Sequence, residues 1–120
     1  MKRDVELIRK ILLQIEAKGE DPLRLIQLDI PGHSESDVAY HVLLLRDAGL
    51  IEAQDLSTMG GFDMRPKRMT WEGHEFLEAA KNDTVWNKAQ EIVKEKGNAI
   101  PFEVLKDLLI KVASSVFGLS

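Results

Sequence analysis

The sequence predicts an α+β fold that is mostly helical and contains one two-stranded hairpin. Three observations support this prediction. Apolar residues recur every three or four positions along most of the chain, which is the period of an amphipathic helix. Strand-like alternation is confined to short runs in the first part of the chain. Two strand-like runs flank a loop that contains Gly60-Gly61, and this arrangement is typical of an extended hairpin.

The N-terminal part of the chain predicts one helix and one strand. Residues 4–18 carry an apolar stripe at helical spacing, and Gly19 can end the helix in the left-handed conformation. The stripe consists of Val5, Ile8, Ile11, Leu12 and Ile15. In residues 23–30 apolar side chains alternate with Gln27 and Asp29, a pattern that indicates a half-buried strand.

A second helix is predicted over residues 34–48. Ser34-Glu35-Ser36-Asp37 has the form of a capping box, with Asp in place of the usual Glu or Gln. Gly49 closes the helix, and Leu50 can pack back on its last turn.

The hairpin is predicted from two strand-like runs, residues 50–54 and 67–71. The loop between them, residues 55–66, is the segment that we expect to be disordered.

Three further helices are predicted at residues 71–80, 84–96 and 100–117. We therefore divide the chain into a core, residues 1–80, and a helical extension, residues 81–120, which packs on the core as part of the same domain.

The phrase Leu43–Ile51, in which a leucine-rich helix end runs through Gly49 into a hairpin, resembles the winged-helix family. The resemblance implies a winged-helix-like domain, with the hairpin as a two-stranded wing and the helix before it as the recognition helix. The stretch between residues 20 and 33 departs from that pattern, because it predicts strand and turn where a helix-turn-helix has a helix.

A second resemblance covers essentially the whole chain. The sequence is similar to a phage- and prophage-associated bacterial family of small proteins known only as a domain of unknown function. Five segments carry this resemblance: Met1–Asp4, Val38–His41, Ser57–Gly61, Pro66–Leu77 and Thr84–Lys88. It implies a phage-linked bacterial origin and no particular activity.

Composition excludes several classes of protein. Sixteen basic against twenty acidic residues give a net charge of −4, which excludes a generally basic nucleic-acid coat protein. The absence of cysteine excludes disulfides and thiolate chemistry. No apolar run approaches the roughly 18 residues of a membrane span, and acids near the N-terminus argue against a signal peptide. We expect a cytoplasmic protein that does not enter a membrane.

Nothing in the sequence indicates an enzyme. The three histidines, His33, His41 and His74, do not stand at a recognised metal-ligand spacing. Asp37 and His41 are four residues apart on one helix, which is more often surface electrostatics than acid–base machinery. We expect no catalytic residue, no metal and no cofactor.

Double-stranded DNA is a candidate partner. If DNA is bound, Ser36, Tyr40 and His41 are expected in the groove, and the wing would contact phosphates. The phosphate contacts are Arg65, Lys67 and Arg68. The charge of the predicted recognition helix opposes this interpretation, since it carries one positive and three negative side chains.

The last helix suggests self-association. It is apolar around much of its circumference, so more than one side must be covered. The stripe predicted at a homodimer interface is Phe102, Leu105, Leu109, Val112 and Val116. The alternative is that the preceding helix covers this stripe within the same chain.

Two functions remain open at this point. The first is a DNA-binding or transcription-regulatory module that acts as a homodimer. The second is a protein-interaction or adaptor module that keeps the winged-helix scaffold without DNA binding and contacts a host or phage protein.

Overall fold

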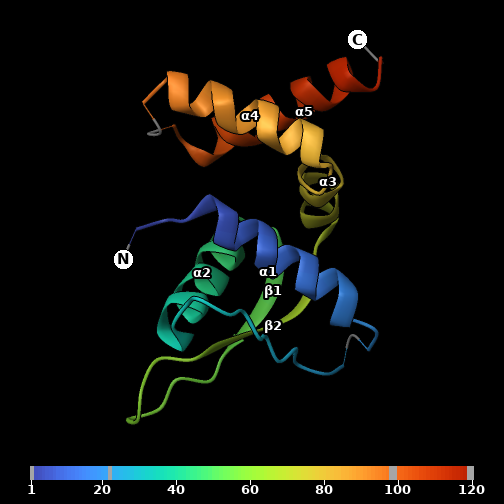
Figure 1. The fold of residues 1–120 in the computed structure, drawn as a ribbon. Coiled ribbons are helices and arrows are strands. Elements are labelled where there is room, and N and C mark those ends of the chain that lie inside the picture. Colours follow the sequence, from blue (N-terminus) through green and yellow to red (C-terminus); the bar gives the residue numbers. More distant parts are fainter. Residues whose placement is uncertain (1, 22, 98–99, 119–120) are drawn as a thin grey trace. The chain divides into compact units, whose positions relative to one another are not determined.

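The computed structural model describes residues 2–21, 23–97 and 100–118. The fold is α+β, as predicted, with five helices and one two-stranded antiparallel sheet in the described residues (Figure 1). The elements in chain order are α1 (Val5–Lys18), α2 (Glu35–Asp47), β1 (Ile51–Asp55), β2 (Met64–Met69), α3 (Trp71–Ala80), α4 (Asp83–Glu95) and α5 (Phe102–Val116). This order is consistent with a winged-helix-like layout.

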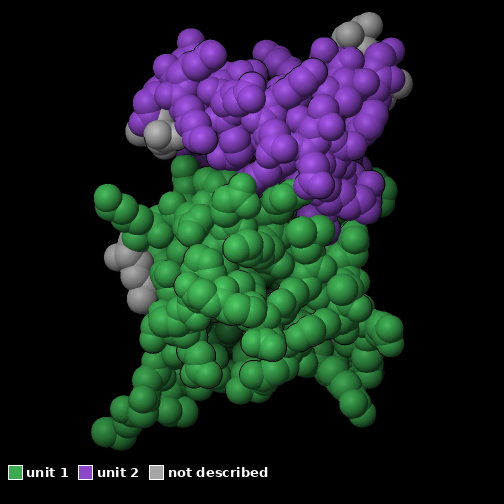
Figure 2. Space-filling view, viewed as in Figure 1, with its two compact units in different colours: residues 1–74 green, residues 75–120 purple. Residues whose placement is uncertain are grey.

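The chain divides into two compact units, residues 1–74 and residues 75–120 (Figure 2). The division falls inside α3, whereas the sequence predicted a boundary at its end. That the extension packs on the core as one domain stays a prediction.

Local capping interactions mark the ends of α1 and α2. The Ser34 side chain accepts a hydrogen bond from the Asp37 N–H at 3.1 Å, and Asp4 does the same for the Leu7 N–H at the start of α1. Gly49 has a φ of 78°, the left-handed conformation that lets the chain reverse after α2.

The core of unit 1 lies where α1 and α2 pack against the hairpin. Its buried side chains come from all of these elements. They include Leu7, Ile11, Leu12, Val42, Leu45, Leu50 and Met69. One polar side chain, His41, is buried among the described residues of this core.

The predicted strand at residues 23–30 is wrong. Side chains alternate as expected, with Ile26 and Ile30 buried and Gln27 and Asp29 exposed, but the backbone forms no ladder. A single backbone bond, from the Ile26 N–H to the Pro66 C=O at 2.8 Å, joins the segment to β2.

The chemistry of Pro66 limits this ladder. Paired residues of an antiparallel ladder exchange two hydrogen bonds, and Pro66 has no N–H to return to Ile26. On the side that faces α1, the Asp29 N–H donates to the Gln14 side chain at 3.0 Å. We call residues 26–30 the half-paired segment.

The hairpin is more regular than expected. β1 and β2 pair from Ile51 opposite Met69 to Asp55 opposite Met64, with a bulge beside Glu52 and Ala53. The segment expected to be disordered instead continues the hairpin, because Thr58 and Gly61 exchange two backbone bonds at 3.0 and 3.1 Å. We call residues 55–63 the hairpin arm.

The predicted second strand began too late and ended inside the next helix. Trp71 opens α3, and the Thr70 hydroxyl accepts from the Gly73 N–H at 3.1 Å as its cap. The same hydroxyl donates to the Gly49 C=O at 2.6 Å, which fastens the start of α3 to the turn after α2.

Unit 2 is formed by the end of α3 and by α4 and α5. Asn82 caps α4 by accepting from the Val85 N–H at 3.0 Å. Trp86 and Leu109 are buried, and the rings of Phe76 and Phe102 stack with centroids 5.3 Å apart. No helix of the described residues is long and apolar enough to cross a membrane.

Candidate interaction surface

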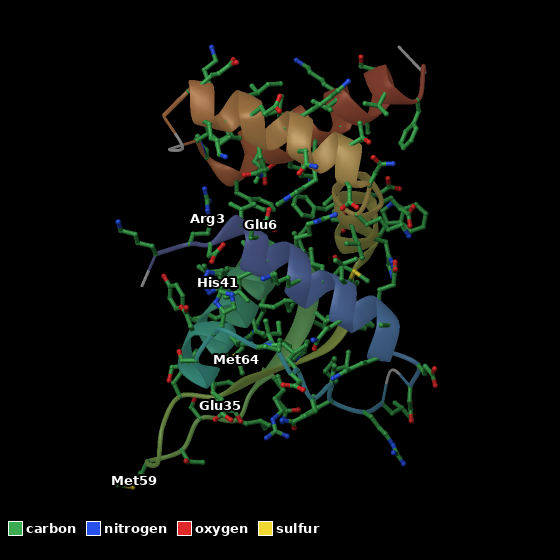
Figure 3. The ribbon with its side chains drawn as sticks, in the orientation of Figure 1. Arg3, Glu6, Glu35, His41, Met59 and Met64 are labelled. Atoms are coloured by element: carbon green, nitrogen blue, oxygen red, sulfur yellow. The ribbon has the colours of Figure 1, made fainter. Side chains whose placement is uncertain are left out.

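A hollow in unit 1 lies between the half-paired segment, the start of α2 and the hairpin. Its volume is about 650 Å³, within the roughly 300–1,000 Å³ range of ligand-binding clefts. Leu28, Glu35, Phe62 and Met64 are among the residues that line it. We call it the hairpin groove. Figure 3 labels Glu35 at the start of α2, and Met59 at the tip of the hairpin arm.

The hairpin groove is acidic. Asp29, Glu35 and Asp63 line it, against one guanidinium, that of Arg65. The Nε of Arg65 lies 3.4 Å from the Asp63 carboxylate, so this positive charge is already balanced locally. These three carboxylates and one guanidinium sum to a charge of −2.

The hairpin arm is shaped by local hydrogen bonds. The Ser57 hydroxyl and then the Ser57 amide hydrogen-bond to Asp55 and hold the pKa of that carboxyl below its ordinary value. The Asp63 N–H donates to the Ser57 hydroxyl at 2.9 Å. These bonds order the arm, whose tip presents the fully exposed side chain of Met59.

The three basic residues predicted to contact phosphates lie on β2. Arg65 pairs with Asp63, and Arg68 pairs with Glu52 across the hairpin at 2.7 Å. Lys67 is the residue left without a counterpart at the bulge. Both arginine side chains are about half exposed, at 43% and 50%. A phosphate contact through either arginine must therefore compete with a carboxylate already in place.

The three residues predicted to enter a DNA groove do not share a surface. Ser36 is exposed and lines the hairpin groove, whereas Tyr40 is half-buried and meets the ring of His41 edge-on. His41 is 0% exposed, so the outward orientation suggested for it from the sequence is not what the structure shows. Figure 3 labels it between α1 and α2.

Both ring nitrogens of His41 have backbone partners. Its Nε2 accepts from the Asp4 N–H at 2.8 Å, and its Nδ1 lies 2.8 Å from the Asp37 C=O. A carbonyl only accepts and an amide N–H only donates, so this geometry calls for an acceptor at Nε2 and a donor at Nδ1. His41 therefore ties the start of α1 to α2 and has a structural role.

Asp37 lies between two histidines. Its carboxylate is 4.0 Å from His33 Nδ1 and 3.8 Å from His41 Nδ1. Among the described residues, no group of three or more His, Asp or Glu side chains is arranged to hold a metal ion.

The stripe of α5 that was predicted at a dimer interface is largely buried within the chain. Leu105 and Leu109 are 1% and 0% exposed and Val112 is 9% exposed, while Phe102 and Val116 are half-buried. Leu105, Leu109 and Val112 are therefore covered within the same chain, which is the alternative to a dimer interface given above.

A different flank of α5 is exposed. Ile110 and Phe117 are 45% and 52% exposed, and both line a shallow hollow of about 550 Å³ against the end of α3. Ala79 lies on its floor, and Glu78 and Lys81 pair at 3.0 Å beside it. We call these residues the α5 flank.

Two predicted site residues, Ser36 and Arg65, line the hairpin groove, but its carboxylates were not predicted as site residues. Asp29 lies in the segment predicted as a strand, and Asp63 lies in the loop predicted to be disordered. The available signal was the run of acids on both sides of Ser36, which was used only as an argument against DNA.

The fold and its surface hollows define a small α+β protein with a winged-helix-like layout. The chain belongs to the family of hypothetical proteins DUF2513, which matches residues 2–99. It is also 36% identical over 118 residues to an uncharacterized protein of Haemophilus influenzae, covering 98% of this chain and 100% of that protein. No solved structure matches the sequence.

Proposed function

We propose that this chain is a protein-interaction module that keeps a winged-helix-like scaffold without binding DNA. The observation that carries the proposal is the acidity of the hairpin groove, where the start of α2 meets the hairpin. A winged helix would present these two elements to DNA. Here they place Asp29, Glu35 and Asp63 together.

Charge arithmetic supports a protein partner over DNA. Affinity for DNA comes largely from neutralised phosphates, and each neutralised phosphate needs an available cation. Arg65 and Arg68 both hold carboxylates, so binding a phosphate through them leaves Asp63 or Glu52 without its partner and close to a second negative charge. Basic segments of proteins meet the opposite situation, because the carboxylates of Asp29 and Glu35 line the groove and attract them.

The first test is a fluorescence-anisotropy titration of mixed-sequence duplex DNA with the whole chain. At about 50 mM salt we expect no binding tighter than roughly 100 µM, the weak end of non-specific DNA affinity. Micromolar binding that weakens steeply as salt rises would contradict the proposal.

The second test is site-specific photocrosslinking in bacterial cells. A photoreactive amino acid replaces the exposed Ser36, and a control variant carries it at Glu91 on α4. We expect a discrete protein adduct at position 36 that is missing at position 91. Adducts of the same size and yield at both positions would contradict a specific partner at this surface.

A DNA-binding or transcription-regulatory module is the second candidate function. The observation that favours it is the presence of Arg65, Lys67 and Arg68 on one strand of the hairpin. If these side chains contact phosphates, replacing all three with Ala lowers DNA affinity and flattens its salt dependence. Unchanged affinity and salt dependence would remove the hairpin from a DNA interface.

The proposal has further parts that come from the sequence. We propose that the chain is not an enzyme, that it works in the cytoplasm, and that its gene is phage-linked. The gene's position among phage genes would check the last of these. We also propose that two copies associate through the α5 flank, because Ile110 and Phe117 are large, exposed apolar side chains that lie together there.

A further inference from the structure

The half-paired segment has backbone groups that point in two directions. In extended chain, successive residues turn their N–H and C=O groups to opposite sides. The Gln27 C=O accepts from the Lys18 ammonium at 2.9 Å, and the Asp29 N–H and C=O both bond to the Gln14 amide. The backbone groups of residues 27 and 29 therefore face α1.

The backbone N–H and C=O of Leu28 face the other way, toward β2. Ile26, two residues earlier, shares this direction and reaches the Pro66 C=O. Among the described residues, the Leu28 N–H and C=O make no hydrogen bond, although Leu28 lines the hairpin groove. A donor and an acceptor of extended backbone are thus left open on the wall of the hollow.

The opposite wall is also extended backbone. The Leu56 N–H donates to the Asp63 C=O at 2.9 Å. The backbone groups of Asp63 therefore face across the hairpin, toward the β1 side. By the same alternation, the backbone groups of Met64, like the C=O of Pro66, face the half-paired segment. The two walls are held together at Ile26 and Pro66 and make no such bond at Leu28 and Met64.

The charge of the lining selects the occupant. Asp29 stands on the half-paired segment, Glu35 at the start of α2 and Asp63 on the hairpin, so carboxylates border the hollow on three sides. An occupant that offers backbone hydrogen bonds and positive side chains satisfies both features.

We infer that the hairpin groove binds an extended, lysine- or arginine-rich peptide segment of a partner protein, which pairs with the Leu28 backbone as an added strand. This inference rests on the proposed function and specifies its site and the chemistry of its partner. Alternate side chains of the peptide face Glu35 and Asp63, while its main chain supplies the missing ladder bonds.

Peptides of defined chemistry test the inference on the whole chain. The probe is an acetylated heptapeptide that alternates lysine and valine, and its matched control carries glutamate in place of lysine. A third peptide has the lysine sequence with alternate amides N-methylated, so it cannot form a full ladder. Binding is followed by ¹H–¹⁵N NMR, with hydrogen exchange measured at the Leu28 amide.

We expect the lysine peptide to bind at least about tenfold more tightly than either control, because it alone offers both charge and ladder. Leu28 amide exchange should slow at least about tenfold on saturation, as it does for an amide that gains a hydrogen bond. Glu35→Lys should weaken binding about threefold to fivefold, in the range of one exposed ion pair. Glu91→Lys on α4, outside the groove, should leave it unchanged.

Two results would overturn the inference. Equal binding of the lysine and glutamate peptides would show that charge does not select the occupant. Binding of the lysine peptide without protection of Leu28 would show that no strand is added.

The outcome is separable from that of the proposed function. If photocrosslinking at Ser36 captures a discrete protein while the Leu28 amide stays unprotected, the module binds proteins in another way. If duplex DNA binds tightly and protects this surface, both the inference and the proposed function are wrong.

Discussion

His41 is a polar residue in a hydrophobic core, and both of its ring nitrogens have backbone partners. Nε2 takes the Asp4 N–H and Nδ1 donates to the Asp37 C=O, each at 2.8 Å. Removing the ring leaves a cavity and deprives the Asp4 amide of its partner. We expect His41→Ala to lower the free energy of unfolding by about 2–4 kcal/mol, measured by urea denaturation followed by circular dichroism.

His74 provides the matched control, because it is an exposed histidine on α3. His74→Ala should change stability by less than about 0.5 kcal/mol. ¹⁵N NMR of the His41 ring gives a second check, since Nε2 should show the shift of an unprotonated nitrogen. Equal stability of the two variants would contradict the structural role of His41.

Gly73 lies where α3 passes over the turn after α2. A Cβ at this position would lie well inside van der Waals contact of the Leu50 carbonyl oxygen, which is backbone and also accepts the Thr70 N–H. We expect Gly73→Ala to destabilise the protein by about 1–3 kcal/mol through overpacking, measured as a shift of the urea midpoint. Gly60→Ala, where the nearest atom is the Thr58 hydroxyl at 3.4 Å, should be close to neutral.

Residues that act locally were predictable and those that act over long range were not. Ser34 and Thr70 cap the helices that follow them, and a cap needs only neighbours within three positions. The buried His41 ring accepts its hydrogen bond from the N–H of Asp4, which is 37 positions away in the sequence. The i, i+4 spacing of Asp37 and His41 fits an exposed pair as well as a buried one.

At the scale of elements, the half-paired segment depends on α1 for its order. Its Asp29 backbone is held by both ends of the Gln14 amide. We expect Gln14→Ala to cost about 1 kcal/mol, the net value of such hydrogen bonds, and to speed hydrogen exchange at the Asp29 amide. Gln27→Ala is the control, because the exposed Gln27 contributes its backbone C=O to α1. Unchanged exchange at Asp29 would contradict the anchoring.

The failed strand prediction shows what alternation can and cannot indicate. The pattern of Ile26, Gln27 and Ile30 correctly predicted which side chains are buried, since that depends on extended backbone alone. A ladder also needs a partner strand with free N–H groups, and Pro66 has none where Ile26 arrives. No feature of residues 23–30 themselves reports that.

At the scale of the whole molecule, each of the two units carries one of the surface hollows described above. Unit 1 carries the acidic hairpin groove, whereas unit 2 carries the apolar α5 flank. The net charge of −4 indicated an acidic protein but not where the acids gather. The sequence showed correctly that α5 is apolar on several sides. Which of these sides stays exposed depends on how the helix packs in the fold.

Self-association is the prediction that belongs to this scale. Ile110 and Phe117 are large apolar side chains that unit 2 leaves exposed, and a matching flank on a second copy would bury both pairs in an isologous dimer. Light scattering should therefore give twice the 13.5 kDa of one chain. Ile110→Lys should return the monomer, because an ammonium group would be buried without a partner.

Asp107→Lys tests whether any new charge on α5 has the same effect, since Asp107 is exposed and does not line the hollow at the flank. This variant should keep the mass of the dimer. A monomeric parent chain at high concentration would contradict self-association through the flank. Each chain of a dimer carries its own hairpin groove, so two grooves would engage a partner with two basic segments far more tightly than one groove engages a single segment.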